Sequence, residues 1–344
     1  HPLGRTYAEM AERGWLVARG ARALRDRHGY TPDVIFGHSG WGETLFLREI
    51  WPDARLLIYA ELMYRTRGHD VGFDPEITPD SDEGRVSTLS RSAHLIQGLV
   101  QADAGLAPTR YQADSFQPEL RGKLTVIHDG IDTGTVRPNP AATLALPNGR
   151  VLKAGDEVLS YVSRSLEPYR GFHVFMRALP RILAERPEAQ VVVVGGDGVS
   201  YGSKPRDADS WKARALAELG DRLPLDRVHF LGRVPYADYL SIMQLTRVHC
   251  YLTYPFVLSW SMLEAMALGA SGWAPRSRSG WDMRPPCISC STRVPPSACT
   301  ASATFAQPVV WASSAMPAWP GKARLVKAVK VPSVTTRPAE ARWA

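Results

Sequence analysis

Two arginines could form an anion-binding site. Arg164 and Arg170 stand six positions apart, directly after the apolar run EVLSYVS at 157–163. Guanidinium groups make paired hydrogen bonds to phosphate oxygens, and the amides at the start of a following helix add positive potential. Gly171 would let the backbone approach such a ligand closely. The alternative is a surface ion pair between Arg170 and Glu167, which would contribute little to stability.

A single glutamate is the second candidate, within TYPFVLSWSMLEAMALG at 253–269. Pro255 ends a strand, and Ser259 can cap the next helix, so that free amides lie at the helix start. Glu264 falls one to two turns inside this helix among apolar residues. A buried carboxylate needs hydrogen-bond donors, and sugar hydroxyls are suitable ones. The alternative is a solvated glutamate on an exposed helix face.

Two further loops follow apolar strands. The glycine-rich GGDGVSYGSK (195–204), which contains Gly196, comes after a run of four valines. It matches neither the dinucleotide-binding fingerprint nor the P-loop pattern, so it is a weak signal alone. The Gly-Arg-Val sequence that ends at Val234 could present backbone groups to a nucleobase. A plain turn accounts for it equally well.

All these residues lie where predicted strands end. Between residues 157 and 269 the sequence alternates four times between an apolar strand and an amphipathic helix. Strands that are apolar on both faces, each followed by a helix, predict a parallel sheet covered on both sides. Such sheets bind ligands at the carboxyl ends of their strands. The alternation therefore predicts that the candidate residues gather at one edge.

The first part of the chain predicts a helix followed by strands. The helix spans residues 7–28, and the predicted strands are 33–38, 54–60 and 124–130. A doubly wound domain normally opens on a strand, so we expect the chain to begin inside a domain.

The alternation of strands and helices predicts an α/β protein with two Rossmann-like doubly wound parallel-sheet domains, both incomplete. Residues 137–156 contain prolines and an Asn-Gly pair, which predict a linker with a hairpin. The domains are then residues 1–136 and residues 157–270.

The basic charge is confined to the end of the chain. Of a formal net charge of +7, residues 271–344 carry +8 and the preceding residues −1. No nucleic-acid partner is therefore expected for the domains. This segment is also rich in Pro, Ser and Trp, and only GKARLVKAVK (321–330) has a helical pattern. Its Cys287-x2-Cys290 has no second pair, so no metal site is expected.

Two interpretations of this tail stay open. A change of reading frame near codon 270 explains the abrupt change in composition, and disorder or a non-native sequence would follow. A basic arm for nucleic acid or anionic lipid is the other interpretation. Sequencing the gene across codon 270 separates them.

Roughly residues 30–269 resemble the retaining GT-B glycosyltransferases of family 4 (group 1). The resemblance is carried in order by DVIFGHSGWG, IHDGID, the Arg-x5-Arg-Gly loop, VVVVGGDG, FLGRVPYADY and the Leu-Glu-Ala-Met-Ala helix. The family helix carries Glu-x7-Glu, whereas this chain has Phe256 in place of the first glutamate. The resemblance therefore implies no role for Phe256 and less carboxylate assistance at the donor sugar.

The resemblance implies roles for individual residues. Arg164 and Arg170 would hold the donor diphosphate, the backbone near Val234 would contact the nucleobase, and Glu264 would bind the ribose. Residues 157–270 would bind the donor, and residues 1–136 would form the acceptor-side domain, in which His38 would face the transferred sugar and its phosphate. The alternative for His38 is a satisfied histidine at a strand end. Gly130 would shape the cleft between the domains.

The reaction implied is transfer of a sugar from a nucleoside-diphosphate sugar to a glycan or lipid-linked hydroxyl with retention, as in polysaccharide biosynthesis. The resemblance implies neither a metal nor a cofactor, because arginines and a helix N-terminus neutralise the leaving diphosphate. The absence of an apolar run long enough to cross a membrane predicts a cytoplasmic protein, compatible with peripheral contact at the inner membrane face. A nucleotide-sugar epimerase and an inactive nucleotide-binding remnant are the alternatives.

Overall fold

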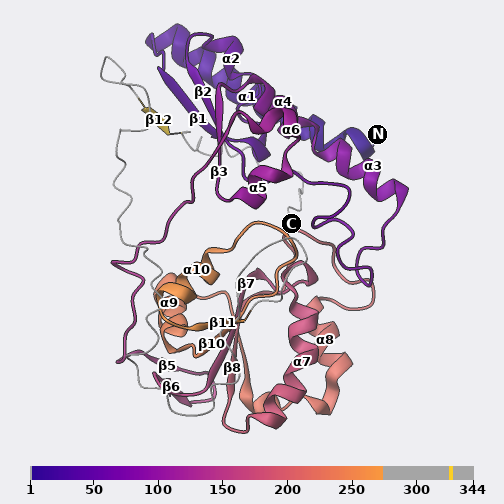
Figure 1. Ribbon diagram of the computed structural model, residues 1–344, viewed down its shortest axis with the longest axis vertical. Coiled ribbons are helices and arrows are strands. Elements are labelled where there is room, and N and C mark those ends of the chain that lie inside the picture. Colours follow the sequence, from indigo (N-terminus) through magenta and orange to yellow (C-terminus); the bar gives the residue numbers. More distant parts are fainter. Residues whose placement is uncertain (1, 274–324, 328–344) are drawn as a thin grey trace. The chain divides into compact units, whose positions relative to one another are not determined.

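The computed structural model describes residues 2–273 and 325–327 (Figure 1). The described chain divides into two compact units. Unit 1 contains residues up to 130, together with 255–257 and the short strand at 325–327, and unit 2 contains 131–254 and the residues from 258. None of the helices in the described chain is both long and apolar enough to span a bilayer. Beyond 271–273 and 325–327, the predicted tail lies outside the described residues.

Unit 1 is built on a five-stranded parallel sheet with the order β12-β1-β2-β3-β4. The strands are β1 (Val34–His38), β2 (Arg55–Tyr59), β3 (Ala104–Ala107), β4 (Leu124–Val126) and β12 (Leu325–Lys327). Leu56 and Ile58 of β2 are buried against a core that includes Leu95, Leu99 and Phe116. The core thus joins the sheet to the helices that connect its strands.

The helices of unit 1 are α1 (Arg5–His28), α2 (Leu47–Ile50), α3 (Asp82–Arg91), α4 (Ala93–Gln101), α5 (Arg110–Ser115) and α6 (Pro118–Arg121). Helix α1 ends at Gly29, whose left-handed φ of 59° lets its amide bond back to Arg25 and Leu24. A left-handed residue at this position is what glycine tolerates best. Short 3₁₀ turns occur at Pro2–Gly4 and Ser39–Trp41.

Unit 2 contains the second five-stranded parallel sheet, in the order β11-β10-β7-β8-β9. Its strands are β7 (Val158–Ser165), β8 (Gln190–Gly196), β9 (Val228–Gly232), β10 (Val248–Cys250) and β11 (Ser271–Trp273). The order reverses between β7 and β10, because the chain first proceeds to β9 and then returns to the other side of β7. This is the topology of a doubly wound sheet.

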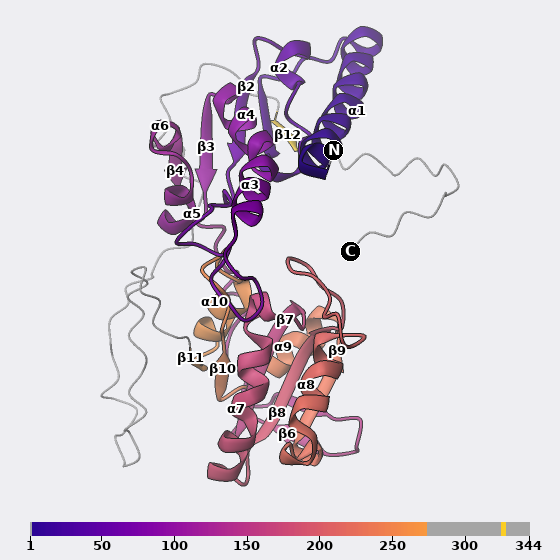
Figure 2. The same cartoon turned by 90° about the vertical axis from the view of Figure 1, so that its right-hand side faces the viewer.

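Four helices cover the two faces of this sheet. They are α7 (Phe172–Glu185), α8 (Trp211–Leu219), α9 (Tyr236–Leu245) and α10 (Trp260–Ala267), with 3₁₀ turns at Pro168–Arg170, Gly220–Arg222 and Leu225–Arg227. Figures 1 and 2 show α7 and α8 on one face and α9 and α10 on the other. Helix α7 buries Phe172, Phe175, Met176, Leu179 and Leu183, a spacing that places one apolar stripe against the sheet.

The hairpin expected within 137–156 is present but packs into unit 2. Strand β5 (Thr143–Ala145) pairs antiparallel with β6 (Val151–Lys153). Leu146 and Leu152 are buried in one core cluster with Val192 of β8. Burial of these side chains makes the hairpin part of a domain, so the connection between the units is shorter than the sequence predicted.

The remaining differences from the sequence prediction are local. Strand β3 was not predicted, because its sequence AGLA lacks the β-branched and aromatic residues that mark strands. Strand β10 ends at Cys250, earlier than the predicted run to 254. Within the segment 321–330, which was expected to be helical, residues 325–327 form β12 parallel to β1.

The buried histidine of β10 makes the stability of unit 2 depend on pH. His249 is fully buried, and its Nδ1 lies 3.0 Å from the hydroxyl of Ser160 on β7. Its Nε2 has no hydrogen-bond partner in the part of the chain that the structure describes. Burial lowers the pKa of His249 to about 4, because the charged imidazolium would be desolvated.

We predict that His249 contributes to loss of stability in acid. Below about pH 6.5 the unfolded chain binds a proton that the folded chain refuses until about pH 4. The free energy of unfolding should therefore fall by up to ~3 kcal/mol from this residue between pH 7 and pH 4. Denaturant unfolding across this range should show a smaller loss for His249→Asn than for the unmodified chain. The exposed His28→Asn serves as the control, and equal losses in all three proteins would contradict the prediction.

Candidate functional site

The loop between β7 and α7 contains two of the predicted anion-binding residues. Gly171 has a left-handed φ of 72°, and a Cβ at this position would lie 2.3 Å from the Cβ of Leu252. Only glycine fits this close approach between the loop and the chain after β10. Arg170 donates from Nη1 to the hydroxyl of Thr253 at 2.9 Å. Its carbonyl accepts a hydrogen bond from the buried Tyr161 hydroxyl, also at 2.9 Å.

Glu167 anchors this loop to the glycine-rich loop after β8. Its side chain is 0% exposed, and its two oxygens accept hydrogen bonds from the amides of Ser200, Tyr201 and Gly202 at 3.0, 3.2 and 3.0 Å. Three amide donors compensate the desolvation of a buried carboxylate. The expected alternative, a surface ion pair with Arg170, is wrong, because this carboxylate is buried and bonds to amides.

The glycine-rich loop also contacts Arg170 through an aromatic ring. The guanidinium of Arg170 lies over the ring of Tyr201 at 5.0 Å, and the ring of Tyr169 is 5.8 Å from that of Tyr201. Cation–π contacts of this kind fix the direction of a long side chain. Because Glu167 holds the backbone of Tyr201, the same carboxylate supports the position of Arg170.

Two exposed arginines border the end of β8. Arg164, near the end of β7, is exposed, and its side chain makes no hydrogen bond or ion pair with a described residue. Arg233 directly follows β9, and a Cβ on Gly196 would lie 2.9 Å from its Nε. Gly196 therefore leaves room for this side chain. The sequence analysis considered only the backbone of this Gly-Arg-Val segment and gave the Arg233 side chain no role, although a residue directly after a strand of a parallel sheet lies at the ligand-binding edge.

The start of α10 differs from the expected pattern in its hydrogen bonds. Ser259 is the N-cap residue, but its hydroxyl lies 3.0 Å from that of Ser261 and does not cap a backbone amide. The amide of Ser259 donates to the hydroxyl of Tyr251 at 2.9 Å. This amide, which we had expected to be free for a ligand, is thus occupied. Phe256, where the family has a glutamate, is buried.

Glu264 lies in the second turn of α10 and is 8% exposed. Its Oε1 accepts a hydrogen bond from the hydroxyl of Tyr236 at 3.1 Å, and its Oε2 accepts one from Tyr239. Burial and the bond to Glu264 raise the pKa of both phenols, so they stay protonated donors. The alternative of a solvated glutamate is therefore wrong. Val234, two residues before Tyr236, is half-buried against the core below.

In unit 1, His38 stands at the end of β1. Its Nδ1 accepts a hydrogen bond from the amide of Gly40 at 2.9 Å, and its Nε2 lies 3.2 Å from an oxygen of Glu61. Because the amide occupies Nδ1, the neutral ring carries its proton on Nε2 and donates to the carboxylate. The rings of Trp41 and Tyr59 lie 5.6 and 5.5 Å from the imidazole. Sequence reasoning did not identify Glu61, which follows β2 as His38 ends β1.

A second polar contact of unit 1 joins the ends of β2 and β4. The hydroxyl of Tyr59 bonds to both oxygens of Asp129, at 2.9 and 3.0 Å. Burial and then this bond to Asp129 raise the pKa of Tyr59. Gly130 follows with a left-handed φ of 82°, and its amide donates to Nδ1 of His128 at 2.9 Å. The turn that carries Gly130 is thus held by local bonds.

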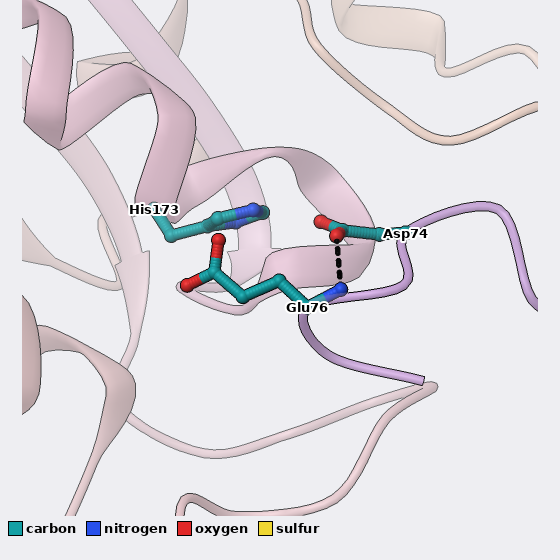
Figure 3. A group of neighbouring side chains, drawn as sticks. All are labelled: Asp74, Glu76 and His173. Atoms are coloured by element: carbon teal, nitrogen blue, oxygen red, sulfur yellow. Dashed lines mark hydrogen bonds between the residues drawn. The ribbon is translucent and has the colours of Figure 1, made fainter. Parts of the chain in front are cut away.

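The long connection after β2 has its own local hydrogen bond. The carboxylate of Asp74 accepts from the amide of Glu76 at 3.1 Å, as Figure 3 shows. This arrangement is an Asx turn, which fixes a loop without regular structure. Figure 3 also draws His173, which is the second residue of α7 and belongs to unit 2.

Comparisons with known proteins identify both halves of the chain. Residues 1–136 match the family described as "Glycosyl transferase family 4 group", and residues 156–271 match "Glycosyl transferases group 1". The chain is 31% identical over 127 residues to a D-inositol 3-phosphate glycosyltransferase of Streptomyces avermitilis. That match covers 35% of this chain and only 27% of the relative.

Two solved structures share the fold. The sucrose-phosphate synthase of Thermosynechococcus elongatus is 20% identical with a TM-score of 0.52, over 75% of this chain and 59% of that one. The catalytic domain of starch synthase IV from Arabidopsis thaliana, bound to ADP and acarbose, is 16% identical with a TM-score of 0.50, over 78% and 61%. The parallel sheets and these neighbours confirm the GT-B fold. With the two family matches, which together span well over half of its residues, the chain belongs to the family 4 (group 1) glycosyltransferases.

Proposed function

We propose that this chain transfers a sugar from a nucleoside-diphosphate sugar to a hydroxyl of a glycan or lipid-linked acceptor, with retention and without a metal ion. The observation that carries the proposal is the set of charged groups at one edge of the unit 2 sheet. Arg164 is the second-last residue of β7, Arg170 lies in the loop that follows this strand, and Glu264 lies in the helix after β10. Cations suit a diphosphate, and a buried carboxylate suits hydroxyl groups.

The relatives support the same chemistry. Membership of the glycosyltransferase family favours sugar transfer, and the starch synthase structure holds the nucleoside diphosphate ADP together with acarbose. The chain spans less than two thirds of each of these relatives, so the activity of the whole protein is part of the proposal. A lipid-linked acceptor would bring a cytoplasmic enzyme to the inner membrane face. The role of His38 at the transferred sugar stays a prediction.

In the proposed reaction the arginines act on the leaving group. The bond between the anomeric carbon and the phosphate oxygen breaks, and negative charge develops on the diphosphate. Guanidinium donors fixed before the reaction stabilise this charge without reorganisation in the transition state. The anchoring of the Arg170 loop by Glu167 and Tyr161 would supply such fixation. The acceptor oxygen then bonds to the anomeric carbon on the same face of the sugar, and its proton passes to the departing diphosphate oxygen.

The donor site can be tested by calorimetric titration with UDP, GDP and ADP and their sugar conjugates. We expect Arg164→Ala and Arg170→Ala each to weaken the diphosphate about tenfold or more, because each removes charge-assisted hydrogen bonds. Binding of the matching nucleoside should change little. Arg181→Ala is the control, since this exposed arginine pairs with Glu185 on α7. Equal losses for nucleoside and diphosphate would argue against a phosphate role.

Product analysis tests the reaction itself. Incubation with the donor that binds should give glycosylated acceptor and free nucleoside diphosphate. Release of an epimerised sugar without any acceptor would instead identify an epimerase. If none of the donors binds, the chain is an inactive remnant of a glycosyltransferase.

The buried carboxylate of Glu167 gives a separate prediction. Glu167→Gln keeps one acceptor oxygen but replaces the other by a donor, which cannot pair with the amides of residues 200–202. We expect a loss of ~2 kcal/mol in the free energy of unfolding, as for other hydrogen bonds to a charged group. Hydrogen exchange at these amides should become faster, and diphosphate binding should weaken with it. The exposed Glu185→Gln is the control, and unchanged exchange at residues 200–202 would refute the anchoring role.

A further inference from the structure

The two tyrosines that donate hydrogen bonds to Glu264 differ in how exposed they are to solvent. Both donate to the carboxylate, Tyr236 to Oε1 at 3.1 Å and Tyr239 to Oε2. Tyr236 is the first residue of α9 and is 54% exposed, whereas Tyr239 lies one turn further along and is only partly exposed. Their rings are 5.7 Å apart and tilted by 35°. One partner of the carboxylate is therefore fixed within the fold, and the other stands at the surface.

The bond to Tyr236 is the one that a ligand can replace. A phenol at the surface loses little when it leaves a carboxylate, because water becomes its new partner. Tyr239 is partly buried and packs against the core cluster that contains Met243 and Ala265, so water reaches its hydroxyl less easily and its departure would cost more. A hydroxyl of an incoming ligand would thus compete with Tyr236 for Oε1, while Tyr239 keeps the carboxylate in place.

We propose that the hydroxyl of Tyr236 holds the position of a ribose hydroxyl on Glu264 and is displaced when the nucleoside of the donor binds. The proposal rests on the proposed function, because it assigns the ribose to this carboxylate. Tyr236 then lowers the affinity for nucleotide in the resting protein, and Tyr239 raises it by orienting Glu264. Replacing either tyrosine by phenylalanine removes one hydroxyl from the same carboxylate. The two replacements should nevertheless change the affinity for nucleotide in opposite directions.

The test is calorimetric titration of the full chain with UDP, GDP and ADP, using whichever binds. Tyr236→Phe removes the competing donor and should tighten binding about three- to tenfold, the net value of one hydrogen bond made by an exposed side chain. Tyr239→Phe should weaken binding by a similar factor, because the carboxylate loses its fixed partner. The matched control is Tyr7→Phe, which removes a phenol bond to Gln97 in unit 1 and should leave the affinity unchanged.

Two further measurements assign the effect to the ribose and to Glu264. The 2′,3′-dideoxy form of the same nucleotide has no hydroxyl to exchange, so it should bind Tyr236→Phe and the unmodified chain equally. In a Glu264→Gln background, Tyr236→Phe should no longer tighten binding of the ribonucleotide. Thermal unfolding of each variant shows whether it is folded.

The outcomes separate the two proposals. Tighter binding of the ribonucleotide alone by Tyr236→Phe supports the exchange. Equal or weaker binding by this variant, with normal binding by the unmodified chain, overturns the exchange and leaves the donor site standing. Failure of the unmodified chain to bind any of the three nucleotides overturns the donor site, and the exchange with it.

Discussion

Parallel pairing of β7 with β8 and β10 is the constraint on which the candidate site depends. Parallel strands run in one direction, so every loop that leaves a carboxyl end leaves from the same edge of the sheet. This pairing brings the arginines at and after the end of β7, the glycine-rich loop after β8 and the Tyr236 turn after β9 to one edge, although they are far apart in the sequence. The reversal of strand order beside β7 leaves space between loops that turn to opposite faces.

The buried carboxylate of Glu167 holds two of the loops at this edge in fixed positions. An ionised group without exposure is costly unless donors replace its water, and the three amides of residues 200–202 supply them. Since the donors are backbone groups, the bonds specify the path of the loop and not the identity of its side chains. The ring of Tyr201 is placed by this path beneath the Arg170 guanidinium. The hydrogen bonds that compensate the burial of Glu167 therefore also determine where Arg170 lies.

The sequence predicted the regular elements well because their apolar spacing is local. The four expected alternations of strand and helix between residues 157 and 269 are all present, from β7 to α10, whereas β3, made of small residues, gave no such signal. The sequence indicated which residues belong to the candidate site but not which residues they contact. The bonds of Glu167 reach 33–35 positions ahead, and those of Glu264 reach 28 and 25 positions back. Separations of this length depend on tertiary packing, which periodicity does not encode.

The charges at this edge differ in how they are compensated. Arg164 and Arg233 make no ion pair with a described residue, and exposed cations contribute little to stability when they do. They would contribute more to the binding of an anion, because a bound anion accepts charge-assisted hydrogen bonds from them. Glu264 is compensated by neutral phenols and not by these cations. Replacing a phenol by a ribose hydroxyl therefore leaves the local charge unchanged, so the nucleoside and the diphosphate can be bound by independent groups.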